Sequence, residues 1–305
     1  MKILLTADWH IRGDRPRCRM DEDWIESQAQ DIRAVHSIAL QEHCDEVWIL
    51  GDLFHQPRCS TEAVNMLLRE LGQIRNDCGV RILPGNHDLP YHDYGNLEQS
   101  SLGIVLKSYP ELTSQVVGLD LDVYARPFGH DDPAEASIMK SSIYCTHQLV
   151  YPNKEAKPLP DLPEPTAQDL LDKAPGVPLV LTGDYHHGYI YTAPDGRRVV
   201  TPGCLNIQAA DLADYQPRVY VLDTTNMAVS EHLLPANGEV AVDYLVAERE
   251  RDERMDRCLE VATNAASVSL SFTDNLREAA ARPETTPGVR GIINEVLDHL
   301  NKDRR

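Results

Sequence analysis

The sequence lacks paired cysteines, a long apolar run and an excess of positive charge. Its seven cysteines are scattered and form no CxxC pair, which disfavours a zinc ribbon or a disulfide framework and favours reduced thiols in a cytosol. The first apolar run, Lys2–Thr6, is too short for a signal peptide or a membrane span, and no other stretch approaches a span. We therefore expect a cytoplasmic location and no membrane partner.

The formal net charge is −19, from 48 acidic and 29 basic residues. Such acidity argues against a large nucleic-acid-binding surface on this chain alone, because phosphate backbones attract basic surfaces. It does not exclude nucleic acid as a substrate. Bound divalent cations would offset several negative charges, and a partner chain could supply the basic surface.

Over the first ninety residues, short apolar runs alternate with segments of helical periodicity. We expect strands at Lys2–Thr6, Val47–Leu50 and Val80–Leu83. Between them we expect a helix from Asp23 to His43 and a second helix capped by Ser60 or Thr61. This order is typical of a largely parallel α/β sheet.

The rest of the chain predicts shorter elements. Leu97–Lys107 is expected to be a helix, and Asn153–Pro178 an exposed loop with a short helix near Leu170. Six further strands are expected, at Asp122–Arg126, Ile143–Thr146, Leu179–Thr182, Tyr189–Thr192, Arg198–Thr201 and Arg218–Asp223.

The character of the sequence changes near Asn237. We assign residues 1–236 to one domain and residues 237–305 to a small, mainly helical C-terminal region. Thr286-Pro287 is a good helix start, and an apolar stripe follows it, made of Val289, Ile292, Ile293, Val296 and Leu300. This helix either folds back on the core or docks a partner, and the sequence favours neither.

Polar side chains follow successive strands at the point where each strand ends. They are Asp8 and His10, Asp52, Asn86 and His87, His147, and Asp184 and His186. Strand ends of a parallel sheet lie at one edge, where ligand sites of α/β proteins form. Because side chains alternate along an extended chain, Asp8 and His10 are expected to point to the same side, as are Asp184 and His186.

These side chains offer oxygen and nitrogen ligands but no thiolate. Such a set suits manganese, iron, zinc or a mixed pair, and it excludes a structural zinc site. Setting His87 aside for proton transfer, the seven ligands are too many for one ion. They suit two ions about 4 Å apart that share a bridging carboxylate.

The pattern resembles the calcineurin-like metallophosphoesterase superfamily, whose motifs run DxH, GDxx, GNHD, H and GHxH. Here they stand as Asp8-Trp9-His10, Gly51-Asp52-Leu53-Phe54, Gly85-Asn86-His87-Asp88, His147 and Gly183-Asp184-Tyr185-His186. The resemblance covers roughly residues 1–225. It implies an α/β fold, the αββα sandwich of that superfamily, here with a small C-terminal helical appendage.

The resemblance also implies how the ligands divide. Asp8, His10 and His186 would hold one ion, Asn86, His147 and residue 184 the other, and Asp52 would bridge them. The superfamily usually has His where this chain has Asp184. A carboxylate still ligates a hard dication, so we expect an intact second site that is biased towards manganese or magnesium. The expected cofactors are two divalent ions, with Mn²⁺ preferred over Mg²⁺, Fe²⁺ or Zn²⁺.

The implied reaction is hydrolysis of a phosphoester by water that the ions activate. His87 would protonate the leaving oxygen, and Asp88 would orient its imidazole. The candidate substrate contacts are Arg12, in a basic loop that is otherwise a solvated surface, and His187, unless it points away from the site. His55 and His92 lie near motifs and are weaker candidates.

Within the superfamily the sequence is most similar to the SbcD-type nuclease subunits of DNA break repair and their phage counterparts. ADWHIRG resembles their DWHLG, GDLFH their GDLFD, and PGNHDL matches well, while Val200–Cys204 resembles their YPGS. RVYVLDT at Arg218–Thr224 resembles the closing strand. Protein phosphatases of the superfamily carry GDxxDRG and GNHE, and they are disfavoured.

This resemblance implies a manganese-dependent DNA exo- and endonuclease that acts in recombination and double-strand-break repair. It would work with an ABC-type ATPase coiled-coil subunit, often as a nuclease dimer, in the host cytoplasm if phage-encoded. Thr286–Leu300 is the candidate partner-binding helix. The rival hypothesis is a small-molecule phosphodiesterase, for example on cyclic nucleotides, which the acidic charge favours. A non-enzymatic scaffold is disfavoured because every motif keeps a chemically competent residue.

Overall fold

Two five-stranded sheets form the centre of the fold. The computed structural model describes residues 1–112, 121–129, 142–159, 161–209, 212–235, 238, 240 and 272–302. The first sheet has the order β10-β9-β1-β2-β3. Its strands are β1 (Lys2–Thr6), β2 (Glu46–Leu50), β3 (Gly79–Leu83), β9 (Arg218–Asp223) and β10 (Ala228–Leu233). Strands β1, β2 and β3 are parallel, whereas β9 runs antiparallel to β1 and to β10.

The second sheet has the order β4-β5-β6-β8-β7. Its strands are β4 (Val123–Arg126), β5 (Ile143–His147), β6 (Leu179–Gly183), β7 (Tyr189–Thr192) and β8 (Arg198–Thr201). Neighbouring strands from β4 to β8 are parallel, and β7 is the antiparallel edge. Strands β5 and β6 are buried along their whole length, which explains their continuous apolar sequence.

The helices begin where the sequence offers a capping side chain. Asp23 accepts from the N–H of Glu26 at the start of α1 (Trp24–Gln41), and Ser60 accepts from Ala63 at the start of α2 (Thr61–Asp77). Thr166 caps α5 (Ala167–Lys173): its hydroxyl accepts from the N–H of Asp169, and the Asp169 carboxylate accepts from the N–H of Thr166. These three helices agree with the predicted ones.

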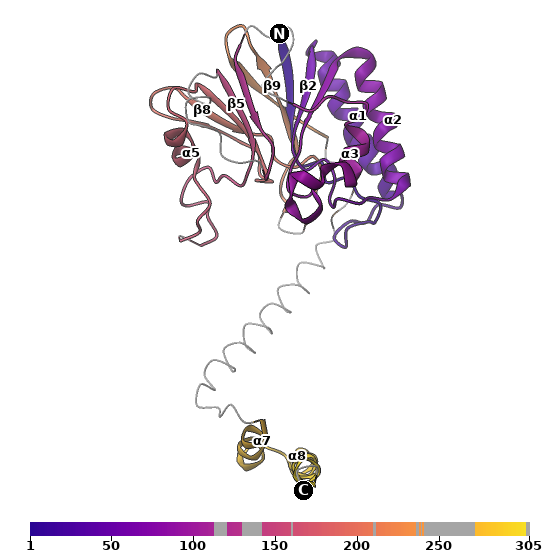
Figure 1. Cartoon of the computed structure of the whole chain (residues 1–305), viewed down its shortest axis with the longest axis vertical. Helices are drawn as coiled ribbons and strands as arrows, with labels where there is room; N and C mark the ends of the chain where they lie inside the picture. The colour runs from indigo at the N-terminus through magenta and orange to yellow at the C-terminus, as the bar shows by residue number, and fades with distance from the viewer. Residues whose placement is uncertain are drawn as a thin grey trace. The chain divides into compact units, whose positions relative to one another are not determined.

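Four layers result, and Figure 1 shows helices α1 and α2 on the outer face of the first sheet. Three apolar clusters separate the layers: one between these helices and the first sheet, one between the two sheets, and one between the second sheet and α5. Trp48 and Leu50 of β2 meet Cys145 and Leu181 in the middle cluster. The predicted αββα fold class is therefore confirmed.

Two predicted details differ from the structure. The helix expected at Leu97–Lys107 is instead the end of a 3-10 turn, η2 (Tyr94–Gln99), followed by a short α3 (Ser101–Val105). A further 3-10 turn, η1 (Pro90–His92), precedes the predicted range. The break falls at Ser100, whose hydroxyl accepts from the N–H of Gly103 and so starts a new helix. Strand β10 was not predicted, because it is largely exposed and carries no apolar run.

The chain divides into two compact units, residues Met1–Tyr244 and Leu245–Arg305. The second contains α7 (Phe272–Ala281) and α8 (Pro287–Lys302), which contact each other. Helix α8 begins where Thr286-Pro287 predicts a start. The predicted boundary between residues 236 and 237 lies outside the described residues. In the described part of the chain, no helix has both the length and the apolar character that crossing a membrane requires.

Candidate metal centre

Ligating side chains from four strand ends converge at one edge of the sheets. Three sets have their ligand atoms within 4.8 Å of one another. The sets are Asp8, His10 and His186; Asp8, Asp52 and His147; and His10, His55 and His87. Five of the seven predicted ligands are in these sets, and they follow strands β1, β2, β5 and β6.

Asp52 lies at the centre of the group. Its Oδ2 is 3.7 Å from His10 Nε2 and 3.4 Å from His147 Nε2. The Asp52 side chain is fully buried, its Oδ1 accepts from the N–H of His87 at 2.9 Å, and its Oδ2 has no hydrogen-bond partner among the described residues. A buried carboxylate oxygen without a donor is costly, and a pair of divalent ions on either side would satisfy it. The residues present therefore fit a bridged two-metal site.

The first half of the centre contains Asp8, His10 and His186. The Nε2 atoms of His10 and His186 lie only 3.1 Å apart. Asp8 is fully buried, and both of its carboxylate oxygens accept from the N–H of Asp184 at 3.1 Å. Two imidazole nitrogens facing each other beside a carboxylate are a donor set suited to one shared cation.

The second half contains His147 and Asn86. His147 Nδ1 lies 2.8 Å from the carbonyl oxygen of Leu50, so this nitrogen donates and Nε2 is left for a ligand or a proton. Nε2 in turn lies 3.0 Å from Asn86 Oδ1. The ring fits only because residue 51 is glycine: a Cβ there would lie 1.9 Å from His147 Nδ1.

Burial and charge strongly perturb these groups. Burial would lower the pKa of His147, but the Asp52 carboxylate outweighs it and raises that pKa to about 10. Burial opposes ionisation of Asp52, yet the imidazoles of His147 and His10 hold its pKa well below its usual range. Burial raises the pKa of Asp8 far above normal and lowers that of His10. Perturbation of this size in one cluster is typical of a functional site.

The backbone at the centre is strained. Asp8, His10, Asp52 and Asp184 have φ values of 50°, 45°, 49° and 76°, in the left-handed region that side chains other than glycine seldom adopt. The predicted explanation for Asp8 and His10 was therefore wrong. They are not extended residues that alternate along a strand but lie in a left-handed turn after β1. Strain of this kind collects at functional sites because the surrounding fold has to enforce it.

His87 and Asp88 are placed differently from the prediction. The Asp88 carboxylate is fully buried and accepts from the N–H groups of Leu53, Phe54 and Gly85, at 3.2, 2.8 and 2.9 Å. The Nδ1 of His87 instead lies 2.8 Å from the carbonyl oxygen of His55. A backbone carbonyl thus orients the imidazole, and Asp88 joins the loop after β2 to the loop after β3. Burial and the Asp52 charge raise the pKa of Asp88 to about 7.

Asp184 differs from the other predicted carboxylate and imidazole ligands because it belongs to none of the three sets. It contributes its backbone N–H to Asp8. Its charge nevertheless helps to raise the pKa of both Asp8 and His147. Its ligation of the second ion stays a prediction.

His55 matters more than the sequence indicated. Its ring stacks 5.7 Å from His87 at 27° and lies 5.6 Å from His10. Burial, together with the nearby Arg12 guanidinium, lowers its pKa to about 4. Its place three residues after Asp52, in GDLFH, was the available signal.

The two predicted substrate contacts lie at the rim. The Arg12 guanidinium, next to His55, donates to Asp14. His187 is exposed, and its ring contacts Tyr185 and Tyr215 rather than the ligand cluster. His92 Nδ1 lies 3.0 Å from the carbonyl oxygen of Asn86. Two further histidines lie outside these sets: His36 pairs with Asp77, and His43 is exposed.

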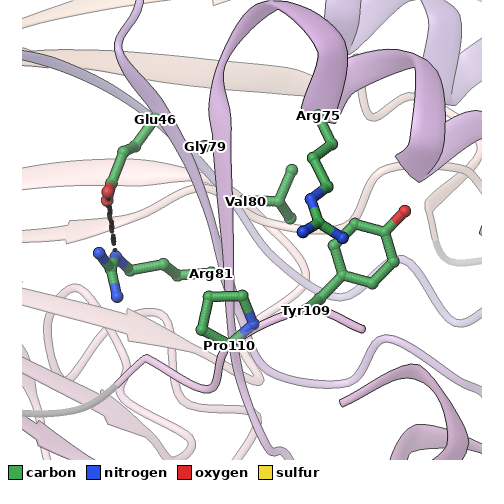
Figure 2. Close-up of a pocket in the computed structure, with 7 residues that line it drawn as sticks. All are labelled: Glu46, Arg75, Gly79, Val80, Arg81, Tyr109 and Pro110. Carbon is green, nitrogen blue, oxygen red and sulfur yellow. Dashed lines mark hydrogen bonds and ion pairs between the residues drawn. The ribbon is translucent and has the colours of Figure 1, made fainter. Parts of the chain in front are cut away.

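A cavity of about 210 Å³ lies at the opposite ends of β2 and β3 (Figure 2). It opens beside Gly79 and Val80, with the Glu46–Arg81 ion pair on one side of β3 and Arg75 over Tyr109 on the other. Both strands begin here and end at the metal centre. With a rise of about 3.3 Å per residue, the two sites are separated by the strand length.

Several solved structures are distantly similar to this chain. TT1561 of Thermus thermophilus is 13% identical, with a TM-score of 0.45 over 76% of this chain and 98% of that one. A dimetal phosphatase from Danio rerio is 13% identical, with a TM-score of 0.47 over 72% and 91%. A phosphoesterase from E. coli is 16% identical, with a TM-score of 0.38 over 77% and 100%.

A search of curated proteins gives no match. The model of one protein family, described as calcineurin-like phosphoesterase, matches residues 1–188. The match covers more than half of the chain and includes every predicted ligand. The chain belongs to the calcineurin-like phosphoesterase family.

Proposed function

We propose that this metal-dependent phosphoesterase is a DNA nuclease that acts in recombination and double-strand-break repair. The observation that carries the phosphoesterase chemistry is the buried Asp52 Oδ2, without a donor, between the imidazoles of His10 and His147. DNA as the substrate rests on the SbcD-like sequences around the motifs: ADWHIRG, GDLFH, PGNHDL and the segment Val200–Cys204.

The ligands divide between two ions as the family motifs imply. Asp8, His10 and His186 would hold one ion, Asn86, His147 and Asp184 would hold the other, and Asp52 would be shared between them. When bound, such ions activate a water and neutralise the charge that develops on the phosphoryl oxygens. A carboxylate at position 184 favours Mn²⁺ or Mg²⁺.

The protein's own residues then manage the leaving group. His87 is oriented by the bond between its Nδ1 and the carbonyl of His55, so in the imidazolium form its Nε2 carries a second proton that it can give to the leaving oxygen, which leaves the ring neutral. Asp88 keeps the two loops in register through three backbone N–H groups. We assign the contacts with the substrate strand to Arg12 and His187.

Cleavage assays with Mn²⁺ test this proposal. Linear double-stranded DNA, single-stranded DNA and a 2′,3′-cyclic nucleotide are offered in parallel. Cleavage of either DNA supports the nuclease. Cleavage of the cyclic nucleotide alone would contradict it and favour small-molecule turnover, the alternative that the net charge of −19 supports.

We further propose that α8 docks an ABC-type ATPase coiled-coil partner. Of its predicted apolar stripe, Ile293 is half-buried, whereas Val289 and Ile292 are 50% and 64% exposed. The side chains of Val296 and Leu300 lie outside the described part of the structure, and Leu297, which was not in the predicted stripe, is buried. Two exposed branched apolar residues three apart fit a helix-in-groove contact. The expected nuclease dimer stays a prediction.

Co-expression with a candidate ATPase tests the docking helix. The paired substitution Val289→Asp and Ile292→Asp is expected to abolish co-purification, as is deletion of Gly288–Arg305. Phosphodiesterase activity on a small chromogenic ester should survive both. Glu295→Gln, on the same helix and exposed, is the matched control, and retained binding in the double variant would place the interface elsewhere.

A further inference from the structure

An aromatic cluster lies immediately beside the metal ligand His186 and has no part in ligation. Tyr185 and His187 flank that ligand, and their rings lie 5.6 Å apart. Tyr185 also contacts Tyr151 at 5.5 Å and Tyr189 at 5.7 Å, while His187 contacts Tyr215 at 5.5 Å. Five rings thus form a continuous group at the rim of the centre.

The rings divide into a fixed base and an accessible top. Tyr215 is 9% exposed and its hydroxyl donates to the carbonyl of Pro202 at 3.2 Å, while the Tyr189 hydroxyl donates to Val150 at 3.0 Å. Tyr185, in contrast, is half-buried and His187 is exposed. The structure therefore presents two accessible rings on a support that is anchored below.

The loop that carries these rings is held rigidly. The N–H of Cys204 donates to the carbonyl of His186 at 3.0 Å. Gly203 has a φ of 80°, and a Cβ there would lie 2.3 Å from the Tyr215 hydroxyl oxygen and 2.7 Å from the His186 carbonyl oxygen. The backbone between the two rings is therefore tied to the segment at Gly203 and Cys204, which lowers the entropic cost of binding.

We propose that Tyr185 and His187 form a stacking platform for one unpaired nucleobase next to the phosphate that is cleaved. The platform rests on the proposed nuclease function. Consecutive Cα atoms are about 3.8 Å apart, so each ring belongs to a residue adjacent to a ligand, within reach of the neighbouring nucleotide. Aromatic rings bind any base by stacking. Arg218, whose guanidinium lies 5.5 Å from the Tyr215 ring and pairs with Glu231 at 2.6 Å, packs against the base of the cluster.

This proposal explains how an acidic protein can hold a polyanion near its centre. With a net charge of −19, little affinity comes from phosphate contacts, so stacking has to supply more of it. A base in a duplex must leave its pair before it can stack on the platform. We therefore expect single-stranded or frayed ends to be preferred, with little preference for sequence.

The test uses the whole protein with Mn²⁺ and a series of single-stranded oligonucleotides. Each has one abasic residue, placed at successive positions around the cleaved bond. One position is expected to lower kcat/KM about tenfold, the loss typical of one stacked base. In Tyr185→Leu the ratio of kcat/KM for the intact strand to kcat/KM for the abasic strand should fall to about one. Tyr185→Phe, which keeps the ring, should retain the ratio of the wild type.

A fluorescent base gives a second readout. 2-Aminopurine at the sensitive position is expected to be quenched on binding to the wild type and to Tyr185→Phe, but not to Tyr185→Leu. His187→Ala, at an exposed position, serves if Tyr185→Leu does not fold. If the kcat/KM ratio were equal in all variants, or if no abasic position lowered kcat/KM in the wild type, the platform would be overturned and the nuclease function would stand. Absence of any DNA cleavage, with a chromogenic ester still hydrolysed, would overturn the nuclease function and the platform with it.

Discussion

The two ends of strands β2 and β3 carry similar residues in opposite situations. At the amino ends, Glu46 is nearly buried but accepts from Arg81 at 2.9 and 3.1 Å and from the Trp48 indole at 2.6 Å. At the carboxyl ends, Asp52 is fully buried, has a left-handed backbone and keeps one oxygen without a donor among the residues that the structure describes. A buried charge alone thus does not mark a functional site. Strain and an unmet bonding requirement do.

The largest effect is expected from Asp52→Ala. Removing the bridging carboxylate takes a ligand from both halves of the centre, so hydrolysis should fall below detection and bound metal should be lost. Asp8→Ala should do the same. Activity assays and metal analysis of the purified variants measure this, with Glu46→Ala at the other end of β2 as control. Normal activity in either Asp variant would refute the two-metal centre.

Chelation should reproduce that loss reversibly. A strong chelator is expected to abolish hydrolysis and lower the free energy of unfolding, since metal at 100 times its Kd stabilises the folded state by about 2.7 kcal/mol. Thermal unfolding with and without Mn²⁺ measures the difference. The same shift should appear in Glu46→Ala and be absent from Asp52→Ala. A chelator-resistant activity would argue against metal chemistry.

The strand ends could be predicted from sequence because apolar runs reveal buried parallel strands, and the polar residues after them share an edge. The geometry within that edge could not. Left-handed φ values at Asp8 and Asp52 arise from tertiary constraints such as the bonds from Asp8 and His10 N–H to the carbonyls of Gly51 and Asp52, each 3.0 Å. Likewise, nothing local to Asp88 indicates that two of its three partners are backbone groups 34 and 35 residues away.

His87→Ala should have the next largest effect. The imidazole lies beside the centre but is proposed to act on the leaving group, so metal content should be kept while cleavage slows by about 100-fold. Hydrolysis of an ester with a poor leaving group should slow more than hydrolysis of a chromogenic ester, because a poor leaving group depends more on protonation. An unchanged rate on DNA would remove His87 as the acid.

Asp184→Asn tests whether the second half of the centre depends on the Asp184 carboxylate while the first half does not. If the Asp184 carboxylate moves onto the second ion, its loss should weaken that site by about tenfold, in line with the loss of a supporting group. Titration with Mn²⁺, followed by calorimetry, should then show one weakened and one intact site. Asp14→Asn, at the rim, is a matched control, and two unaltered sites would mean that Asp184 acts only through its N–H to Asp8.

The smallest effect on hydrolysis is expected at the amino ends of the strands. Glu46→Ala leaves the Arg81 guanidinium without its partner in a largely buried place, which should cost about 3 kcal/mol of folding free energy. The kcat/KM of the folded enzyme should not change, because the affected ion pair is a strand length away from the ligands. The double variant Glu46→Ala and Arg81→Ala should recover part of the stability, since no charge is then left unpaired. Denaturant unfolding and steady-state kinetics on the three variants separate these effects. A fall in kcat/KM that parallels the loss of stability would show that the two ends of the strands are coupled, and that the centre depends on more than its own loops.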